Sequence, residues 1–461
     1  MIASPAWRGK RFAVLGLARS GAATVRALLA GGAEVVAWDS DAAKRDALSP
    51  SPLRGEGRGE GLSEAVSPVT APLPTLSPEG RGLLSFADPE SIDLTGFDGL
   101  IVSPGVPLNR HPVAAKARAA GVPILGDIEL FAQARATLPA HKVVGITGTN
   151  GKSTTTALIH HILQTAGVPS LMGGNIGLPI LAQEPLPEGG VYVLELSSYQ
   201  IDLTYTLDCD VAVLLNITPD HLDRYDGFAG YAASKFRLFH MQSHDHVGVM
   251  RRDDPIASVP SMEWKNGPGS WHLPAIGWGT NLQGKWPSLQ GPHNAENAAA
   301  AYAACFELGL KTDFILAAME TFTGLPHRME RVATHAGVTF VNDSKATNPE
   351  STAPALAAFD RIHWIVGGKA KGADLDACRP HFGHVARAYT IGEAGPVFAA
   401  LLRDTMPVEE AGTLAAAVAS AAAQAQPGDT VLLSPACASF DQFRDFEQRG
   451  DVFRAAVEAL R

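Results

Sequence analysis

The stretch that most constrains this chain runs from 143 to 156. It reads as a short apolar strand, the turn Gly-Thr-Asn-Gly at 148–151, then Lys152, Ser153 and the start of a helix. Such a turn and helix start present backbone N–H groups and the positive end of the helix dipole to an anion. A lysine here reaches a terminal phosphate, and the serine hydroxyl suits Mg²⁺. We therefore predict a phosphate-binding loop rather than an ordinary glycine-rich turn.

One position departs from the general phosphate-loop pattern G-x-x-x-x-G-K-[ST]. That pattern requires glycine at position 146, where this chain has Ile146. The match is instead to Gly-Thr-Asn-Gly-Lys-Ser at 148–153. The loop predicts a bound nucleotide, and its variant form indicates a separate subclass of nucleotide-binding proteins.

Length and composition bound the class of protein. The 461 residues fit about three domains of roughly 150 residues each. Apolar residues make up 46%, enough for several cores, and charged residues only 18%, so the chain does not read as disordered. The formal net charge of −10 argues against a surface for nucleic acid or anionic membranes, although local cations can still form a cleft for an anionic substrate.

The cysteines and the apolar runs bear on the compartment. Cys209, Cys305, Cys378 and Cys437 are far apart and form no C-x-x-C pair, so they read as reduced thiols and not as a disulfide framework or a zinc site. The N-terminal residues lack the apolar core of a signal peptide, and no apolar run approaches the length that spans a bilayer. We expect a cytoplasmic protein without membrane insertion.

The beginning of the chain predicts a Rossmann-like fold. A buried-type strand at 11–17 leads into a glycine turn and a helix, and a second strand at 33–38 ends at Asp39. The dinucleotide fingerprint requires a second glycine in that turn, and this chain has Ala18 there. A nicotinamide or flavin cofactor is therefore less expected than another nucleotide or a nucleotide sugar. A later strand at 99–102 ends in a tight turn at the same edge.

The stretch 49–82 breaks this pattern. Ser-Pro pairs recur in it, few apolar residues are available for burial, and no period is visible. We expect a surface insertion there that contributes little to a core.

After the phosphate loop, two further strands carry polar residues at their ends. The strand at 191–196 ends in Glu195, and the strand at 211–215 is followed by His221. Because the carboxyl ends of parallel strands meet at one edge, this carboxylate and this imidazole are expected beside the phosphate loop.

Two helices of the same region carry further polar residues. A helix at 231–240 carries Lys235. A long alanine-rich helix opens with Asn294 and Asn297, which are three residues apart and therefore share a face.

The last part of the chain predicts a third α/β domain in which strands and helices alternate. Its strands are expected at 339–342, 363–367, 388–391 and 430–434. Polar turns are expected at 342–348, 367–372 and 434–443. Boundaries at Gly126 and Gly324 give the expected domains 1–126, 127–324 and 325–461.

Taken together, these motifs resemble the Mur ligases, the ATP-dependent amide-bond-forming enzymes of peptidoglycan precursor synthesis. The phosphate loop marks only the wider family, whereas 342–348, 433–443 and 446–450 point to its glutamate-adding member. The likeness spans all three domains except 49–82. It implies an α/β fold of three domains: a Rossmann-like N-terminal domain for a UDP-sugar, a central P-loop ATPase domain with a mostly parallel sheet, and a Rossmann-like C-terminal domain for glutamate.

The resemblance also implies the reaction. ATP would phosphorylate the alanyl carboxylate of UDP-N-acetylmuramoyl-L-alanine, and the amine of D-glutamate would then displace phosphate from the acyl phosphate. A carboxylate is a poor acylating group, so ATP supplies the leaving group, and positioning with charge neutralisation lowers most of the barrier. We expect a monomer that binds these small molecules.

The catalytic residues that the resemblance implies are Lys152, Glu195, His221, Lys235 and Arg328. Lys152 would hold the β- and γ-phosphates of ATP, and Arg328 would reach the γ-phosphate from the third domain. Ser153 and Glu195 would bind one Mg²⁺, and His221 would serve a second. An ammonium has only donors. The corresponding lysine of the family is carbamylated by CO₂, so Lys235 would support the metal site as a carbamate.

The implied binding residues form two larger sets. Those for the nucleotide are Gly148, Thr149, Asn150, Gly151, Lys152, Ser153, Thr154, Asn294, Asn297, Arg328, Asp343 and Lys345. Those for the other substrates are Ser20, Asp39, Gly105 and Asn175 at the UDP-sugar, and Thr347, Lys371, Ser439, Phe440 and Phe446 at glutamate. A dicarboxylate requires a cation and hydroxyl donors, which Lys371, Thr347 and Ser439 supply together.

This chain departs from the family pattern at the UDP-sugar site. Other members can carry Asp-Thr-Arg after the second strand, whereas this chain has Asp39, Ser40 and Asp41. The arginine near the uridine or its phosphates is absent, and our hypothesis is that Arg19 substitutes for it. Phe440 also stands where other members can carry a different apolar residue, so the wall of the glutamate pocket is expected to differ in shape.

The sequence leaves two kinds of alternative open. A ligase that adds L-glutamate, or one that extends folate with glutamate, would share most motifs, although the turns of the first domain favour a UDP-sugar over folate. A P-loop phosphotransferase or a nucleotide sensor would share the phosphate loop, but it would not require the Glu, His and Lys set or a third domain.

Overall fold

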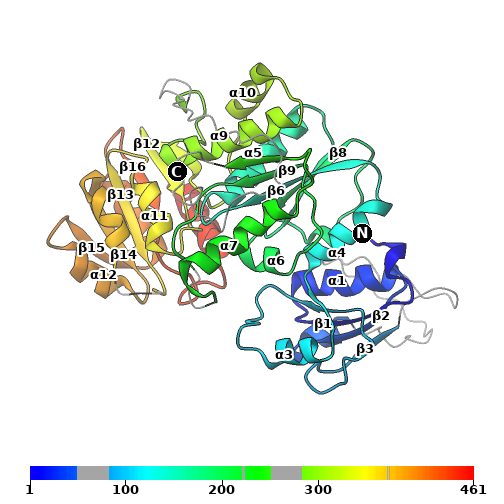
Figure 1. Ribbon diagram of the computed structural model, residues 1–461. Coiled ribbons are helices and arrows are strands. Elements are labelled where there is room, and N and C mark those ends of the chain that lie inside the picture. Colours follow the sequence, from blue (N-terminus) through cyan, green and yellow to red (C-terminus); the bar gives the residue numbers. More distant parts are fainter. Residues whose placement is uncertain (49–82, 221–223, 251–282, 371, 373, 461) are drawn as a thin grey trace, which may run out of the picture.

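The computed structural model describes residues 1–48, 83–220, 224–250, 283–370, 372 and 374–460. The predicted insertion 49–82 and the predicted site residues His221 and Lys371 lie outside them. Within the described residues the strands form three sheets, and helices pack on their faces (Figure 1). This is the α/β architecture that the sequence predicts.

The N-terminal sheet is parallel throughout. Its strands are β1 (Arg11–Leu15), β2 (Glu34–Trp38), β3 (Leu84–Phe86), β4 (Gly99–Val102) and β5 (Ile124–Leu125). Its helices are α1 (Arg19–Ala30), α2 (Ala42–Asp46) and α3 (Pro112–Ala119). The strand order is β3-β2-β1-β4-β5, so the order reverses between β1 and β4. Ligands of open α/β sheets bind at such a switch point, and the glycine turn after β1 lies there.

The central sheet is also parallel in every pair that the described residues form. Its strands are β6 (His141–Thr147), β7 (Ser170–Gly174), β8 (Gly190–Glu195), β9 (Val211–Leu214) and β10 (Val247–Met250). The order is β10-β9-β6-β8-β7, so β6 lies between β8 and β9. Ile146 of β6 pairs with Glu195 of β8, and Thr147 pairs with Leu214 of β9. The three carboxyl ends therefore meet beside the phosphate loop.

Helices cover both faces of the central sheet (Figure 1). They are α4 (Asp127–Ala134), α5 (Lys152–Thr165), α6 (Ser198–Asp202), α7 (Gly227–His240), α9 (Pro292–Glu307) and α10 (Thr312–Glu320). Val144 of β6 packs in one core with α5, α9 and α10, and Val143 packs in the opposite core with α4, α6 and α7. Because successive side chains of a strand point to opposite faces, both faces need apolar residues, and β6 reads as a continuous apolar run.

The C-terminal sheet is mixed. Its strands are β11 (Glu330–His335), β12 (Val338–Asn342), β13 (Ile362–Gly367), β14 (Val385–Ile391), β15 (Val408–Gly412) and β16 (Thr430–Leu433). Its helices are α11 (Pro349–Leu356), α12 (Gly395–Leu402), α13 (Leu414–Gln424) and α14 (Phe446–Glu458). The order is β11-β12-β16-β13-β14-β15, with β11 antiparallel to β12. The edge strands β11 and β15 were not predicted, because they are polar and only partly buried.

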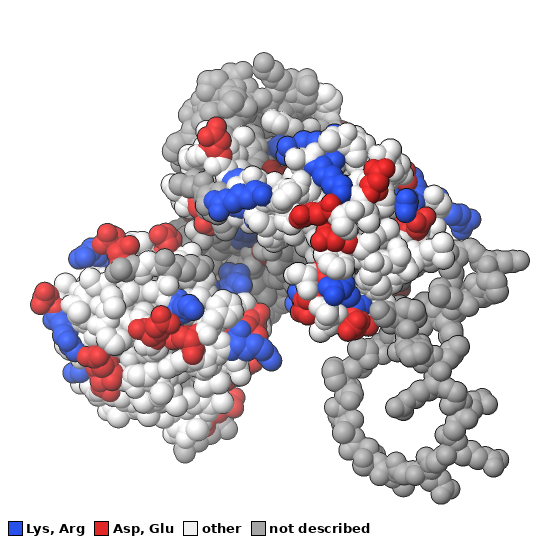
Figure 2. Space-filling view, turned by 90° about the horizontal axis from the view of Figure 1, so that it is seen from below, with Lys and Arg blue, Asp and Glu red and all other residues white. Residues whose placement is uncertain are grey.

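Short 3₁₀ segments complete the described helices, at Pro5–Trp7, Arg135–Thr137, Ile180–Ala182 and Asp376–His384. The four cysteines are free and buried, in line with the predicted reduced thiols. Among the helices that the structure describes, none combines the length and the apolar character that crossing a membrane requires. On the face seen in Figure 2, basic and acidic side chains are interspersed over the described surface.

Candidate active site

The phosphate loop between β6 and α5 depends on two glycines with positive φ, a conformation that other residues rarely adopt. Gly148 has φ 147° and Gly151 has φ 88°, and a Cβ on Gly151 would lie 2.2 Å from Oδ1 of Asn297. The end of β9 braces the loop, because the Thr149 and Asn150 N–H groups donate to the carbonyl and side-chain oxygens of Asn216 at 2.8 and 2.9 Å. Backbone and side chain thus define the loop before any ligand binds.

Lys152 folds back over this loop. Its Nζ donates to the carbonyl oxygens of Gly148 and Thr149, both at 2.8 Å. Burial lowers the pKa of this ammonium. The two hydrogen bonds hold the Lys152 amine at the centre of the loop, where a phosphate would exchange for the two carbonyls.

Three predicted residues meet at the hydroxyl of Ser153, the second residue of α5. The hydroxyl donates to Oε2 of Glu195 at 2.5 Å and accepts from Nη2 of Arg328 at 2.8 Å. The other carboxylate oxygen of Glu195 accepts from Nδ2 of Asn175 at 2.8 Å. Residues from three separate parts of the chain therefore surround one hydroxyl and one buried carboxylate.

Lys235 of α7 lies on the other side of the phosphate loop. Its side chain is 2% exposed, and its Nζ donates to the carbonyl oxygen of Gly148 at 3.0 Å. Nζ also lies 4.7 Å from the ring centroid of Tyr231. Burial, and after it the nearby Lys152 ammonium, lowers the pKa of Lys235 to about 7. Two lysine side chains therefore share one carbonyl oxygen of the loop.

Arg328 reaches the loop through an unusual turn before the C-terminal sheet. Its neighbours His327 and Met329 have φ values of 61° and 48°, a left-handed conformation that is uncommon for residues other than glycine. The Met329 N–H donates to Oδ1 of Asp343 at 3.2 Å, and the Lys345 N–H donates to the His327 carbonyl at 3.0 Å. The loop after β12 therefore holds the turn that aims Arg328 at Ser153.

Asp343 and Lys345 are both buried enough to shift their titration. Burial raises the pKa of Asp343 to about 7, and its Oδ2 accepts from the Ser434 hydroxyl at 2.8 Å. Burial, and then the Arg328 charge, lowers the pKa of Lys345 to about 8. The Lys345 ammonium lies 3.7 Å from the ring centroid of Phe446.

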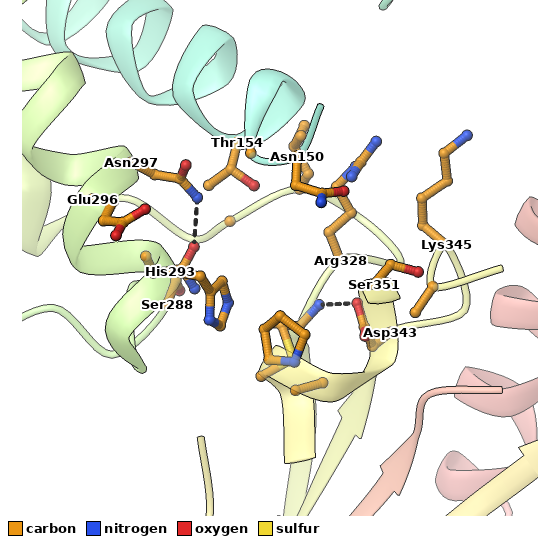
Figure 3. Close-up of a pocket in the computed structure, with 18 of the residues that line it drawn as sticks. Asn150, Thr154, Ser288, His293, Glu296, Asn297, Arg328, Asp343, Lys345 and Ser351 are labelled. Carbon is orange, nitrogen blue, oxygen red and sulfur yellow. Dashed lines mark hydrogen bonds between the residues drawn. The ribbon is translucent and has the colours of Figure 1, made fainter. Parts of the chain in front are cut away.

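A cavity of about 120 Å³ opens between the central and C-terminal sheets. Asn150 and Thr154 line it from the phosphate loop and α5, and Arg328, Asp343 and Lys345 face them from the C-terminal side (Figure 3). On the third side α9 supplies a buried amide pair. Asn297 donates to Oδ1 of Asn294 at 3.1 Å, which confirms that the two share a face.

The residues that are predicted to bind the substrate glutamate lie beyond the carboxyl edge of the C-terminal sheet. Thr347 follows β12, and Ser439 follows the adjacent parallel strand β16. Ser439 is 2% exposed, whereas Phe440 is 69% exposed and does not form a closed pocket wall here. Phe446 opens α14.

The predicted UDP-sugar residues lie at the carboxyl edge of the N-terminal sheet. Ser20 is in the first turn of α1, and Gly105 is in the turn after β4. Asp39 accepts from the Leu17 N–H at 2.7 Å and from the Asp41 N–H at 3.0 Å. The Nη2 of Arg19 donates to the Gly177 carbonyl at 3.0 Å.

The donor set suits Mg²⁺, a hard cation that prefers oxygen ligands. The Ser153 hydroxyl and the Glu195 carboxylate already lie within hydrogen-bond distance, next to the phosphate loop. Within the part of the chain that the structure describes, no group of three or more His, Cys, Asp or Glu side chains could hold a metal. Ser153 and Lys235 are not of those types, and His221 lies outside the described residues.

Sequence reasoning did not single out several residues of the cavity, namely Asn216, Ser288, His293, Glu296 and Ser351. His293 is the most informative. Burial lowers its pKa to about 4, so the ring is neutral, and among the described residues its Nδ1 has no hydrogen-bond partner. The sequence signal that could have identified His293 as a cavity residue is its position directly before Asn294.

Comparison with known proteins gives a consistent result. Residues 146–271 match the family model of the Mur ligase middle domain, and residues 327–437 match that of the Mur ligase glutamate ligase domain. The chain is 60% identical to the UDP-N-acetylmuramoylalanine–D-glutamate ligase of Novosphingobium aromaticivorans, over 100% of this chain and 97% of that protein. It is 57% identical to the protein of the same name from Sphingopyxis alaskensis, over 100% of both.

Solved structures agree on the fold. The UDP-N-acetylmuramate-alanine ligase of Thermotoga maritima aligns with a TM-score of 0.53 at 15% identity, over 98% of this chain and 100% of that one. A folylpolyglutamate synthase/dihydrofolate synthase of Yersinia pestis aligns with a TM-score of 0.51 at 18% identity, over 72% of this chain and 93% of that one. At these identities the likeness shows the fold alone. With its full-length relatives at 57 to 60% identity, the chain belongs to the Mur ligase family.

Proposed function

We propose that this protein uses ATP to join D-glutamate to UDP-N-acetylmuramoyl-L-alanine in peptidoglycan precursor synthesis. One observation carries the proposal: Arg328, which precedes the C-terminal sheet, donates to Ser153 of the phosphate loop, beside the buried carboxylate of Glu195. A phosphate loop that only sensed a nucleotide would not need a cation from a third sheet. Full-length similarity to D-glutamate ligases supports the identity of the substrates.

The cations around the loop suit transfer of the γ-phosphoryl group. The alanyl carboxylate attacks the γ-phosphorus, the bond to the bridging oxygen breaks, and ADP leaves with that electron pair. Lys152 and Arg328 neutralise charge on the transferred group, and their positions are fixed in advance by the loop and the left-handed turn. The cavity beside them, with the neutral ring of His293 and the amides of α9, suits the nucleoside end of ATP.

The second half of the reaction is amide formation. The neutral amine of D-glutamate attacks the carbonyl carbon of the acyl phosphate, the C–O bond breaks and phosphate leaves with its electron pair, and the nitrogen loses its proton to solvent. Thr347 and Ser439, after the adjacent strands β12 and β16, together with Lys371, would bind the two carboxylates of glutamate. The contact of Arg328 with Ser153 already joins the C-terminal side to the phosphate loop, and a further approach of the C-terminal sheet on substrate binding would bring the amine to the acyl group.

Ser153 and Glu195 would hold Mg²⁺, which when bound neutralises phosphate charge, and His221 would serve a second ion. The buried Lys235 amine points at the same loop, and as a carbamate it would contribute oxygen ligands. Its environment suits that reaction, because CO₂ combines with the neutral amine. Enzyme equilibrated with ¹³C-bicarbonate should show one carbamate carbon resonance that is missing in Lys235→Ala. The same spectrum from both proteins would overturn the carbamate.

We also propose the domain boundaries 1–126, 127–324 and 325–461, a monomeric state and a cytoplasmic location. The three sheets of the described residues support the boundaries. Limited proteolysis that yields fragments cut near 126 and 324, and a mass near 48.4 kDa by light scattering, are the expected results. A dimer mass would contradict the monomer.

Phosphate release tests the whole proposal. It should require ATP, UDP-N-acetylmuramoyl-L-alanine and D-glutamate together, and stop when any one is omitted. L-glutamate in place of D-glutamate should give little turnover, and a folate acceptor none. Release with ATP alone at the full rate would indicate a nucleotide hydrolase or sensor, and a preference for L-glutamate or folate would select the other ligases.

A further inference from the structure

Arg224, in the segment between β9 and α7, binds the N-terminal sheet although it belongs to the central one. Its Nη2 donates to the Val106 carbonyl at 3.1 Å and lies 3.5 Å from the Pro104 carbonyl. Both acceptors are in the loop that follows β4. The guanidinium carbon lies 4.1 Å from the ring centroid of Tyr199. The Arg224 guanidinium thus lies between the Tyr199 ring of α6, beside the central sheet, and the carbonyls of the loop after β4, in the N-terminal sheet.

The base of Arg224 is held firmly on the central side. Tyr199 stacks on Tyr225 with centroids 6.1 Å apart and an angle of 14° between the ring planes. The Tyr225 hydroxyl donates to Asp202 at 2.8 Å, and the Ser234 hydroxyl donates to the same carboxylate at 2.7 Å. Ser234 directly precedes Lys235 on α7. The network that anchors Arg224 is therefore continuous with the helix that faces the phosphate loop.

On the side of the N-terminal sheet, the loop after β4 that Arg224 contacts is part of the proposed UDP-sugar site. The Ser103 hydroxyl donates to the Gly16 carbonyl at 2.9 Å, and the Val106 N–H donates to the Ser103 carbonyl at 3.0 Å. Gly16 has φ 91°, and a Cβ there would lie 2.8 Å from Oγ of Ser103. The loop and the turn after β1 are therefore joined directly; of the proposed UDP-sugar residues, Gly105 lies in this loop and Ser20 lies in α1, just after the turn.

Other contacts also join the two sheets, since the Tyr205 hydroxyl donates to the Ile124 carbonyl at 3.2 Å and the Gly126 N–H donates to the Leu203 carbonyl at 2.9 Å, but these reach β5 and the residue after it, not the loop after β4. A cavity of about 360 Å³ lies beside it, and Pro104, Val106, Tyr199 and Arg224 are among its walls. Removing the guanidinium would enlarge this space and free the loop from the central sheet on that side.

We propose that Arg224 is a positioning residue of the ligation, which sets the nucleoside-diphosphate end of the substrate at a fixed place relative to the phosphate loop. The proposal rests on the proposed function, since a substrate that spans two sheets reacts only when both ends are in register. A displacement of about 1 Å at the reacting atoms can cost about 100-fold in rate. Arg224 itself touches neither nucleotide in this scheme.

The chain offers a matched control in Arg237 of α7. Its guanidinium carbon lies 5.3 Å from the Tyr205 ring centroid, and its Nη2 donates to the Thr204 carbonyl at 2.9 Å. It makes the same two kinds of contact, but both with residues between α6 and β9. The link from there to the N-terminal sheet runs from the Tyr205 hydroxyl to the Ile124 carbonyl at 3.2 Å and does not involve Arg237. Arg224→Ala, Arg224→Lys and Arg237→Ala are compared by steady-state kinetics for each substrate, by calorimetric titration with UDP, and by thermal unfolding.

Arg224→Ala is expected to lose about 100-fold in kcat/KM for UDP-N-acetylmuramoyl-L-alanine. Its dissociation constant for UDP alone and its KM for ATP should stay within about threefold of wild type, because neither ligand alone spans the contact between the N-terminal and central sheets that Arg224 makes. The kcat/KM of Arg224→Lys should fall between those of wild type and Arg224→Ala. An ammonium can still donate to a carbonyl, but it lacks the planar stacking surface and the fork of donors. Arg237→Ala should match wild type in kinetics, and its loss of thermal stability should resemble that of Arg224→Ala.

Two results overturn the positioning role while the proposed function stands. One is an Arg224→Ala enzyme whose kinetics match those of Arg237→Ala. The other is a loss of UDP affinity as large as the loss of kcat/KM, which would make Arg224 a nucleotide ligand. If wild-type enzyme releases no phosphate with these substrates, the proposed function is wrong, and the positioning role falls with it.

Discussion

The glycine turn that leads from β1 into α1 and the one that leads from β6 into α5 have the same order of elements, but the side chains around the two turns differ. In the first turn the Leu17 N–H already donates to the carboxylate of Asp39, and Arg19 donates to Gly177. In the second turn Lys152 and Lys235 both donate to the Gly148 carbonyl. Arg328 adds a third cation at Ser153.

The difference teaches that the turn alone does not decide which phosphate chemistry a sheet supports. In the first turn the Leu17 N–H is already bonded to Asp39, so it offers little positive charge to a ligand. This suits a part of the substrate that is bound but does not react. Lys235, which is buried, and Lys152 and Arg328, which are partly buried, all have lowered pKa values, so their charged forms are disfavoured until an anion arrives. That arrangement suits a polyphosphate whose charge changes during reaction.

The largest expected effect comes from removing the buried lysine side chain at the second turn. Lys235→Ala should lower kcat about 10³-fold, because the proposed carbamate and its support of the metal next to the γ-phosphate are lost. Thermal unfolding should show an intact fold, since the hydrogen bond that is lost, to the Gly148 carbonyl, is also made by Lys152. Lys142→Ala, an exposed lysine of β6, is the control. Near-normal phosphate release by Lys235→Ala would remove Lys235 from the reaction.

The next effect concerns the cation from the third sheet. Arg328→Ala should lower kcat about 100-fold with little change in the KM for UDP-N-acetylmuramoyl-L-alanine. Arg328→Lys should not restore the rate, because lysine lacks the planar fork of donors and is shorter in reach. Arg331→Ala, an exposed arginine three residues on, should behave as wild type. Full activity of Arg328→Lys would mean that only the positive charge at this position matters, and not the directed hydrogen bond to Ser153.

A third prediction compares buried carboxylates. Asp39 has a lowered pKa, although burial works against this, because two backbone N–H groups and Lys44 favour its charged form. Asp127, the first residue of α4, is buried with Oδ2 unpartnered among the described residues, and burial raises its pKa to about 6. A raised folded pKa contributes stability that is present below the unfolded value of about 4 and is lost as the pH rises through about 6.

Asp127→Asn should therefore stabilise the protein by about 2 kcal/mol at pH 8 and have little effect at pH 4. Denaturant unfolding of both proteins at the two pH values measures this difference. An Asp127→Asn protein that is less stable at pH 8 would mean that the carboxylate has a partner when charged.

The smallest effect belongs to the first turn. Arg19→Ala should raise the KM for the UDP-substrate about fivefold and leave kcat unchanged, because an exposed charge contact contributes up to about 1 kcal/mol. Arg26→Ala, on an exposed position of the same helix, is the control. No change in KM for Arg19→Ala would mean that its contact with Gly177 is its only role.

Much of the second turn was predictable from sequence. The phosphate loop, Glu195 at a strand end and the shared face of Asn294 and Asn297 follow from local periodicity and from the rule that parallel strands end at one edge. The central strands were recognisable because both faces are buried. The edge strands β11 and β15 were missed, since a half-exposed polar strand carries no comparable pattern.

What the sequence by itself determined is therefore the order of elements and the residues that each strand end delivers. Only the tertiary structure decided that Arg328 lies on Ser153, that two lysines share the Gly148 carbonyl, and that Arg224 crosses to the Pro104 loop. These contacts join residues far apart in the chain. Their geometry depends on how whole sheets pack and on side-chain directions, which no local period records.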